Sequence, residues 1–284
     1  MPTAGSIITN IKRLAGDPDG DWLTDAIGLD FLDRSQRRFC HKVLPLDEFQ
    51  DFTITAKQPR FTVATDVITP INLMWYKSRV IKLAYTPPDM WSRVEEANPT
   101  STGTPELYTF LRRQIVVGPQ VPSTASGAVL ASGAITAATV QITMASVSNL
   151  RTKGYFKINS EVVEYTAQSG TILTGCVRGV HGTTAASHAS GDTGTQIDLI
   201  MLYRKTPPVM TATTSSPEIP AAFHDYLERY ALYLYWLARG DSDKAAAAMN
   251  EFQDMEADAI KTIGRRVQDG LIHIQEKRNR LRWW

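Results

Sequence analysis

An acidic segment near the start of the sequence, Asp17-Pro18-Asp19-Gly20-Asp21, has carboxylates spaced as at the start of a calcium-binding loop. An EF-hand loop needs glycine at its sixth position and glutamate at its twelfth. Here the glycine comes fourth and the twelfth position is Gly28, so the ligand set would be incomplete. A turn whose last aspartate caps the next helix explains the same residues, and we predict no calcium site.

Cys176, His181 and His188 are the residues whose types could bind zinc. Their spacing matches no common structural zinc pattern, and a second nearby cysteine is missing. We therefore interpret all three as turn residues of a β-rich segment and predict no metal site.

The sequence also shows no recognisable set of catalytic residues. The sequence contains no G-x-S-x-G elbow, no Walker loop and no H-E-x-x-H helix. Glu161 and Glu164 are three residues apart on an expected strand, so they should point to opposite faces and could not act together as a glycosidase pair. We predict that the protein is not an enzyme and needs no cofactor.

The end of the sequence is basic and aromatic. From Lys261 to Trp284 it has seven basic and two acidic side chains, and it finishes with two tryptophans. Tryptophan and arginine anchor interfaces, and exposed tryptophans are unfavourable in water. We predict a docking tail at residues 265–284; the alternatives are a tail folded on its own core and contact with nucleic acid. The docking residues are Arg278, Arg280, Leu281, Arg282, Trp283 and Trp284.

Helices are expected at both ends of the chain. An apolar stripe from Ile7 to Ala15, with Ser6 as its N-cap, predicts one helix, and a stripe from Ile27 to Val43 predicts a second. A longer stripe begins at Phe223, continues through Leu237 and Ala238, and ends at Gly240. A further stripe follows from Ala245 to Ile263, and the two predict an antiparallel helical hairpin. The expected hairpin core is Phe223, Tyr226, Leu227, Tyr230, Leu234 and Phe252.

Between these helices the pattern changes to short strands. Alternation in Asp51–Ala56 and Arg60–Ala64, on either side of Lys57-Gln58-Pro59, predicts a β-hairpin. Pro87-Pro88 and the stretch 98–105 predict loops. Further strands are expected at Ile71–Tyr76, Val80–Tyr85, Ile115–Val117 and Ile197–Tyr203.

Residues 125–195 have a distinct composition. Of these 71 residues, 39 are Ala, Gly, Ser or Thr and only seven are charged, as in a flexible linker. Periodic apolar runs, such as those at 155–158 and 161–165, instead predict a small all-β domain.

Composition excludes several classes. The 284 residues carry 30 basic and 29 acidic side chains, and this near-neutral charge argues against a protein that coats nucleic acid non-specifically, because such coating needs a basic surface. Cys40 and Cys176 are expected to be reduced thiols, and we find no signal peptide and no apolar run long enough for a membrane helix. These features predict a soluble protein of a reducing cytoplasm.

The C-terminal pattern resembles the head-to-tail connector, or adaptor, proteins of tailed bacteriophages. The most specific stretch is Ile219–Ala231, followed by Ala238–Asp241 and Phe252; Gly103–Pro105, Tyr108 and Ile115–Pro119 are similar to the strands that precede it. The resemblance covers roughly residues 5–122 and 196–264. Separately, Glu161–Thr166, Leu173–Gly179 and His181–His188 resemble a small β module of phage virion proteins.

The resemblance implies an α+β fold in which the connector domain has two N-terminal helices, a small β-sheet and the C-terminal hairpin. We place this discontinuous domain at residues 1–122 and 196–264, interrupted by the inserted β-domain at 125–195. In the connector family a short turn would join the strands that flank this insert.

The same resemblance implies a function. It implies a homo-oligomeric ring, typically of twelve subunits, that joins the portal protein of the head to a tail or nozzle protein in the virion neck. Double-stranded DNA would pass through it without specific binding, and the tail at 265–284 would reach a neighbouring subunit or the portal. The ring's exact stoichiometry, the tail-side partner, the insert's role and the host stay open.

Two other functions are compatible with the sequence. The inserted β-domain could make the protein a neck or tail adhesion protein that binds tail fibres or host surface glycan. A hydrolase of the host envelope would need a carboxylate pair or an activated nucleophile, which we do not find.

Overall fold

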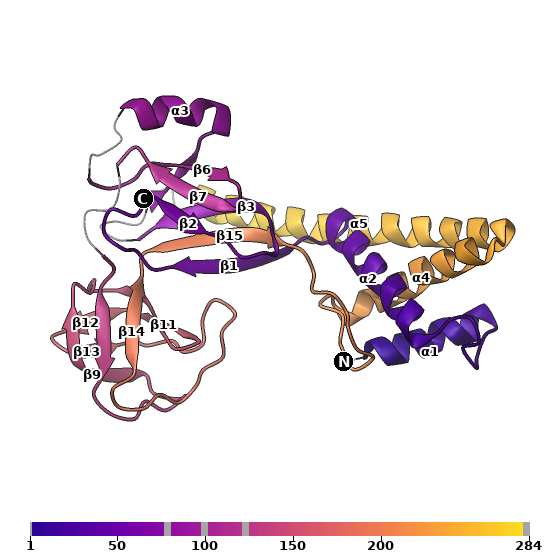
Figure 1. Cartoon of the computed structure of the whole chain (residues 1–284), viewed down its shortest axis with the longest axis horizontal. Helices are drawn as coiled ribbons and strands as arrows, with labels where there is room; N and C mark the ends of the chain where they lie inside the picture. The colour runs from indigo at the N-terminus through magenta and orange to yellow at the C-terminus, as the bar shows by residue number, and fades with distance from the viewer. Residues whose placement is uncertain (1, 77–80, 98–101, 121–124, 281–284) are drawn as a thin grey trace. The chain divides into compact units, whose positions relative to one another are not determined.

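The computed structural model describes residues 2–76, 81–97, 102–120 and 125–280 (Figure 1). The chain divides into two compact units, one formed by Met1–Leu46 with Thr206–Trp284 and the other by Asp47–Lys205. The first is helical and the second is built mainly from strands, so the predicted α+β class is confirmed. The domain boundaries derived from sequence stay a prediction.

The helical unit packs two N-terminal helices against a C-terminal hairpin. Its elements are α1 (Ala4–Ala15), α2 (Asp25–Lys42), the 3₁₀ turn η1 (Ala221–Phe223), α4 (His224–Arg239) and α5 (Ser242–Arg280). One hydrophobic core joins them, and Ile8, Leu32, Leu227 and Phe252 are among its fully buried side chains. Buried apolar area from all four α-helices therefore holds this unit together.

The ends of these helices differ in detail from the sequence interpretation. The N-cap of α1 is Thr3, not Ser6, because the Thr3 hydroxyl accepts a hydrogen bond from the Ser6 backbone N–H. Thr24, not Asp21, caps α2 in the same way. Either hydroxyl satisfies an N–H group that the first helical turn leaves without a partner.

The connection between α4 and α5 is only two residues long. Gly240 ends α4 with a φ of 75°, a left-handed conformation that glycine adopts without steric cost. The Asp241 side chain then accepts a hydrogen bond from the Lys244 backbone N–H at 3.1 Å. The predicted hairpin turn is thus present, and it makes α4 and α5 antiparallel neighbours (Figure 1).

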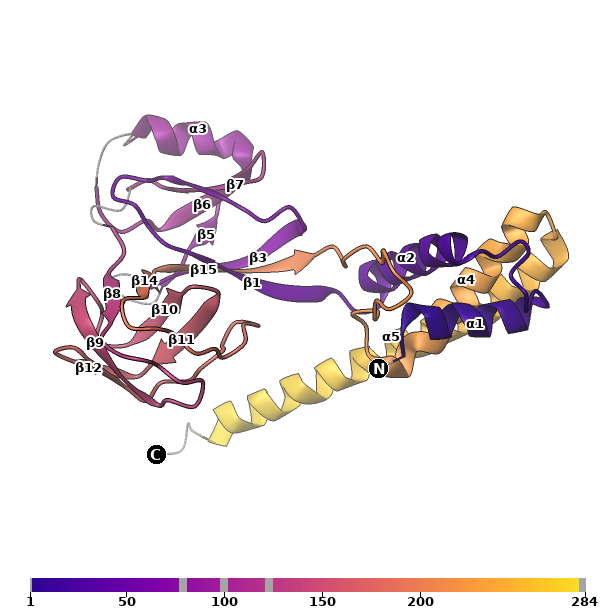
Figure 2. The ribbon, with the colours of Figure 1, turned by 60° about the horizontal axis from the view of Figure 1, so that its bottom comes forward.

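Helix α5 is much longer than its apolar stripe. It has 39 residues against 16 in α4, and it continues beyond Ile263, where the stripe ends (Figure 2). Much of the predicted tail at 265–284 is therefore helical, up to Arg280. The stripe on α4 also ends early, because Leu237 is 54% exposed while Tyr235 is fully buried.

The strand-rich unit contains two four-stranded sheets that share one core. The first has the order β1 (Leu46–Phe52), β15 (Leu199–Lys205), β3 (Val67–Trp75) and β4 (Ile81–Lys82). The second has the order β2 (Arg60–Thr62), β7 (Gln114–Gly118), β6 (Leu107–Leu111) and β5 (Ala84–Tyr85). Phe61, Trp75, Ile115 and Met201 lie in their common core.

A seven-stranded sheet with its own core follows in the same unit. Its order is β11 (Glu161–Tyr165), β10 (Gly154–Ile158), β14 (Thr193–Ile197), β8 (Ala128–Ala131), β9 (Gln141–Ser148), β13 (Ile172–Thr174) and β12 (Ala167–Ser169). Phe156, Tyr165 and Leu173 are fully buried within it. Residues rich in Ala, Gly, Ser and Thr thus form an ordered sheet, as their periodicity indicated.

Four sequence interpretations in this unit are wrong. The strand expected at Val80–Tyr85 divides, over its described residues, into β4 and β5, which belong to different sheets. The expected hairpin of Asp51–Ala56 and Arg60–Ala64 does not form, because β1 lies beside β15 while β2 pairs with β7. The expected single strand Ile197–Tyr203 is interrupted at Asp198 and divides between two sheets. The Pro87-Pro88 loop includes the start of helix α3 (Pro88–Ala97), where proline is tolerated in the first turn.

Candidate interaction site

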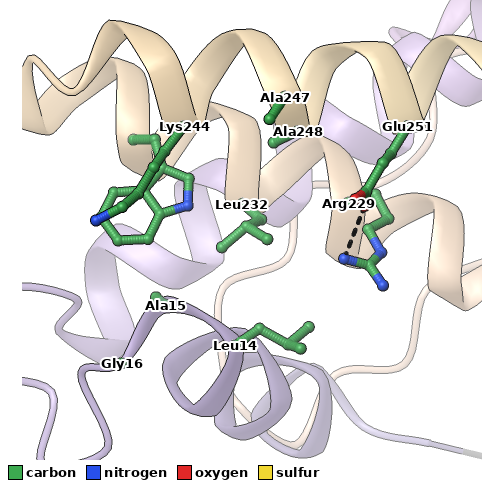
Figure 3. Close-up of a pocket in the computed structure, with 10 residues that line it drawn as sticks. Leu14, Ala15, Gly16, Arg229, Leu232, Lys244, Ala247, Ala248 and Glu251 are labelled. Atoms are coloured by element: carbon green, nitrogen blue, oxygen red, sulfur yellow. Dashed lines mark ion pairs between the residues drawn. The ribbon is translucent and has the colours of Figure 1, made fainter.

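A groove lies next to the turn between α4 and α5 in the helical unit (Figure 3). It has a volume of about 430 Å³ and an apolar floor. The end of α1 and both helices of the hairpin line it: Leu14, Ala15, Gly16, Arg229, Leu232, Trp236, Lys244, Ala247, Ala248 and Glu251. All of these residues belong to one compact unit, so the groove is a property of that unit alone.

The groove exists because small residues on α5 and at the end of α1 leave space between the larger side chains that line it. Ala247 and Ala248 on α5 leave space that a larger residue would fill, and Leu14 remains 41% exposed on the opposite wall. Gly16 ends α1 beside them with a φ of 71°, so the chain turns away without a side chain at that point. An exposed leucine beside vacant space is a surface that an apolar side chain from elsewhere could cover.

Charged groups frame this apolar floor. Arg229 Nη1 lies 3.0 Å from Glu251 Oε2 at one end (Figure 3). At the other end Lys244 Nζ lies 4.2 Å from the centroid of the Trp236 ring and 3.1 Å from Asp241 Oδ2. Apolar floor and polar rim together match the anatomy of a protein interface.

Charged side chains are also distributed unevenly along the sequence of α5 and the residues that follow it. Between residues 242 and 262 it has five acidic side chains and two basic ones, a net charge of −3 (2 − 5). From 263 to 284 the chain has six basic and two acidic side chains, a net charge of +4 (6 − 2). The groove lies beside the acidic half, and the predicted docking residues follow in the basic half.

A buried carboxylate organises the irregular segment that follows β13 in the seven-stranded sheet. Glu161 is fully buried, and its oxygens accept two hydrogen bonds from Arg178, both at 2.7 Å. The backbone N–H groups of Gly179 and Ala186 donate two more, and His188 Nε2 lies 2.7 Å away. This one side chain therefore holds four positions of the segment 178–188 against strand β11.

These contacts set the ionisation of Glu161. Burial alone would raise its pKa, but the hydrogen bonds from Arg178, the Ala186 backbone and His188 outweigh it and lower the pKa from 4.5 to about 2. The group is thus a fixed anion at neutral pH. A fully occupied anion has no free oxygen for substrate, so we interpret the cluster as structural.

Acid should therefore weaken the seven-stranded sheet. Because the folded pKa lies below the unfolded value, the carboxylate stabilises the fold fully above about pH 5 and progressively less as the pH falls toward about 2. A shift of this size corresponds to about 3 kcal/mol. Urea denaturation of the wild type and of Glu161→Gln should show the difference between their free energies of unfolding shrinking by about 3 kcal/mol as the pH falls over this range. A difference that stays constant with pH would contradict the assignment.

Two further clusters lie where the seven-stranded sheet meets the four-stranded sheets. Asp198, between β14 and β15, accepts a hydrogen bond from Ser126 Oγ at 2.8 Å and lies 3.3 Å from Arg151 Nη2. His181 Nδ1 lies 2.8 Å from Asp51 Oδ1, and its ring stacks on Phe49. Sequence reasoning did not identify these contacts.

The comparison with known families decides the identity of the chain. A family model described as SU10 adaptor protein matches residues 2–275, nearly the whole sequence. The chain belongs to the SU10 adaptor family. No curated protein matches it. Membership identifies a phage adaptor protein, suggests a place in the virion, and implies a non-enzymatic role and contacts with other virion proteins.

The structure places the adaptor's other chemical candidates in structural roles. Asp17 accepts hydrogen bonds from the backbone N–H groups of Asp21, Trp22 and Leu23, which hold its pKa below the usual value and occupy the oxygens a calcium ion would need. Cys176 is buried, and the two histidines bind carboxylates as described above. Within the described residues, no group of His, Cys, Asp and Glu could hold a metal ion.

The six residues expected in the hairpin core of the adaptor all lie at one cluster. Tyr226, Leu227 and Phe252 are buried, while Phe223, Tyr230 and Leu234 are partly buried and pack against the same core. The docking residues cannot be placed: Arg278 and Arg280 are in α5, but their side chains and all of 281–284 lie outside the described residues. Over the part of the adaptor that is described, no helix has the length and apolarity to cross a bilayer.

Proposed function

We propose that this adaptor forms a closed ring, of about twelve subunits, that joins the portal vertex of the phage head to the tail in the virion neck. Membership of the SU10 adaptor family over residues 2–275 is the observation that carries the proposal. Its partners are the portal protein above and a tail or nozzle protein below. DNA passes through the ring, and assembly takes place in the host cytoplasm.

The charge of the subunit supports a channel role. With 30 basic and 29 acidic side chains, the subunit lacks the strong positive field that would bind the DNA backbone along its path. A conduit needs this property, because each tight phosphate contact would slow passage of the genome.

Polarity along α5 supports a ring. Rings are closed by heterologous contacts, in which one surface of a subunit meets a different surface of the next. The acidic first part of α5 and the basic residues after 262 give every copy two stretches of opposite charge that could meet in this way. The docking residues from Arg278 to Trp284 belong to the basic stretch of the sequence, which in this proposal contacts a neighbouring subunit or the portal.

Electron microscopy of the purified full chain, alone and mixed with portal rings of the same phage, tests the proposal. We expect rings alone or an added ring of density on one end of the portal. A monomer that leaves portal rings unchanged at high protein concentration would contradict the proposed function.

A further inference from the structure

The groove beside the α4–α5 turn has the size and surface of a binding site without an occupant from its own unit. Its volume of about 430 Å³ falls in the range of about 300–1,000 Å³ that ligand pockets have. Leu14 and Ala247 are exposed at it, and Leu232 is buried beneath. One or two large apolar side chains would complete this surface.

Trp283 and Trp284 have the chemistry that such a groove accepts. They follow a helix whose last turns are basic, and aromatic side chains flanked by arginine are enriched at the anchor points of interfaces. Trp236 and Lys244 at the groove show that this surface already packs an indole ring beside a cation, at 4.2 Å.

The occupant cannot come from the same copy. Ala248 and Arg280 are 32 residues apart on α5 (280 − 248), which at about 1.5 Å per residue separates them by about 48 Å. The four residues from Leu281 to Trp284 span at most about 14 Å when fully extended. A tryptophan of this segment can therefore reach such a groove only on another molecule.

The charge distribution along α5 favours contact with a second copy of this chain. Residues 263–284 carry a net charge of +4, to which Leu281–Trp284 contribute +1 through Arg282, and the groove lies on the half of α5 whose net charge is −3. The lining of the groove itself has two cations, Arg229 and Lys244, and one anion, Glu251, which pairs with Arg229. Asp243, Glu251 and Asp254 are exposed on that half. Opposite charges at the two ends of one helix favour head-to-tail association and disfavour side-by-side contact in register.

We propose that Leu281–Trp284 of one subunit inserts its tryptophans into the groove between α1, α4 and α5 of the next subunit. This inference rests on the proposed ring and specifies the contact that closes it. Every copy offers one tail and one groove, which is the requirement for a heterologous ring.

Cysteine cross-linking of full-length chains tests the contact directly. One preparation carries Leu14→Cys and the other Trp283→Cys; they are mixed under mild oxidation, with and without portal rings of the same phage. The native Cys40 and Cys176 are both buried and give the background. We expect a disulfide-linked pair of adaptor chains, and none when Val140→Cys, at an exposed position in the bend just before β9, replaces Leu14→Cys.

Complementation adds a second test. The Trp283→Ala/Trp284→Ala chain keeps the groove but lacks the tryptophans that would fill it. The Ala247→Trp chain keeps these tryptophans, but its own groove is filled by the new side chain. Each alone should assemble at least about tenfold more weakly than the wild type, as loss of interface anchors predicts. A mixture of the two variants should give one-to-one dimers that cannot extend to rings. Each variant should have a circular dichroism spectrum like that of the wild type, which shows that it is folded.

The outcomes separate this inference from the proposed function. Rings that form with both tryptophans replaced, or rings without the cross-link, would overturn the inference and leave the ring itself intact. Loss of portal binding alone, in rings that still assemble, would also overturn it and make the portal the occupant. Absence of any ring with wild-type protein would contradict both proposals.

Discussion

Replacing Glu161 with glutamine is expected to lower the free energy of unfolding of the adaptor's seven-stranded sheet by about 3–5 kcal/mol. The amide would retain the shape of the carboxyl group but turn an N–H donor toward other donors. The Arg178 guanidinium, only 6% exposed, would be left without its anion. An unpaired buried charge is among the most costly changes that one substitution can make.

The effect should be local as well as large. Amide hydrogen exchange at Gly179 and Ala186, whose N–H groups bond to Glu161, should accelerate first. Glu164→Gln, the same chemical change on a partly exposed side chain of β11, should alter stability by less than about 1 kcal/mol. Equal effects of the two substitutions, measured by urea denaturation of the full chain, would exclude a special role for the cluster.

Replacing Phe252 with alanine is expected to destabilise the helical unit by about 3–5 kcal/mol. Phe252 is fully buried on α5, and its ring centroid lies 4.6 Å from that of Tyr226 and 4.8 Å from that of Tyr230. The Arg38 guanidinium lies 4.9 Å from it. Removing the ring would leave a cavity bounded by α2, α4 and α5.

Circular dichroism during urea denaturation measures this change, because helices dominate the far-ultraviolet signal. Ile260→Ala on the same helix is the control, since Ile260 is 47% exposed and should contribute within about 1 kcal/mol. If the two substitutions had similar effects, Phe252 would not be the centre of this core. Ring assembly should fail in the Phe252→Ala chain, because the groove depends on the hairpin.

Local sequence rules predicted the helical unit best. The two N-terminal helices and the hairpin turn at Gly240 follow from apolar spacing and from glycine's access to positive φ, both of which depend on near neighbours in the chain. The caps were misplaced by a few residues, because several hydroxyl and carboxyl side chains compete for the same N–H groups.

Strand partners were much less predictable. The alternation of polar and apolar residues at 51–56 and 60–64 indicates which side chains are buried, but it does not determine which other strand each of these segments pairs with. β2 therefore pairs with β7, more than 50 residues away, in place of the nearest strand. The break at Asp198 was missed for the same reason, since its hydrogen bonds involve Ser126 and other distant groups.

The sequence by itself determined the family pattern, the class of fold and the charge polarity of α5. Each of these depends only on the type and spacing of residues. Only the tertiary structure decided that Glu161 joins Arg178 and His188, and that Leu14 faces Ala247 across a groove. Such sites combine side chains from separate elements, and their distances are set by packing that no local spacing encodes.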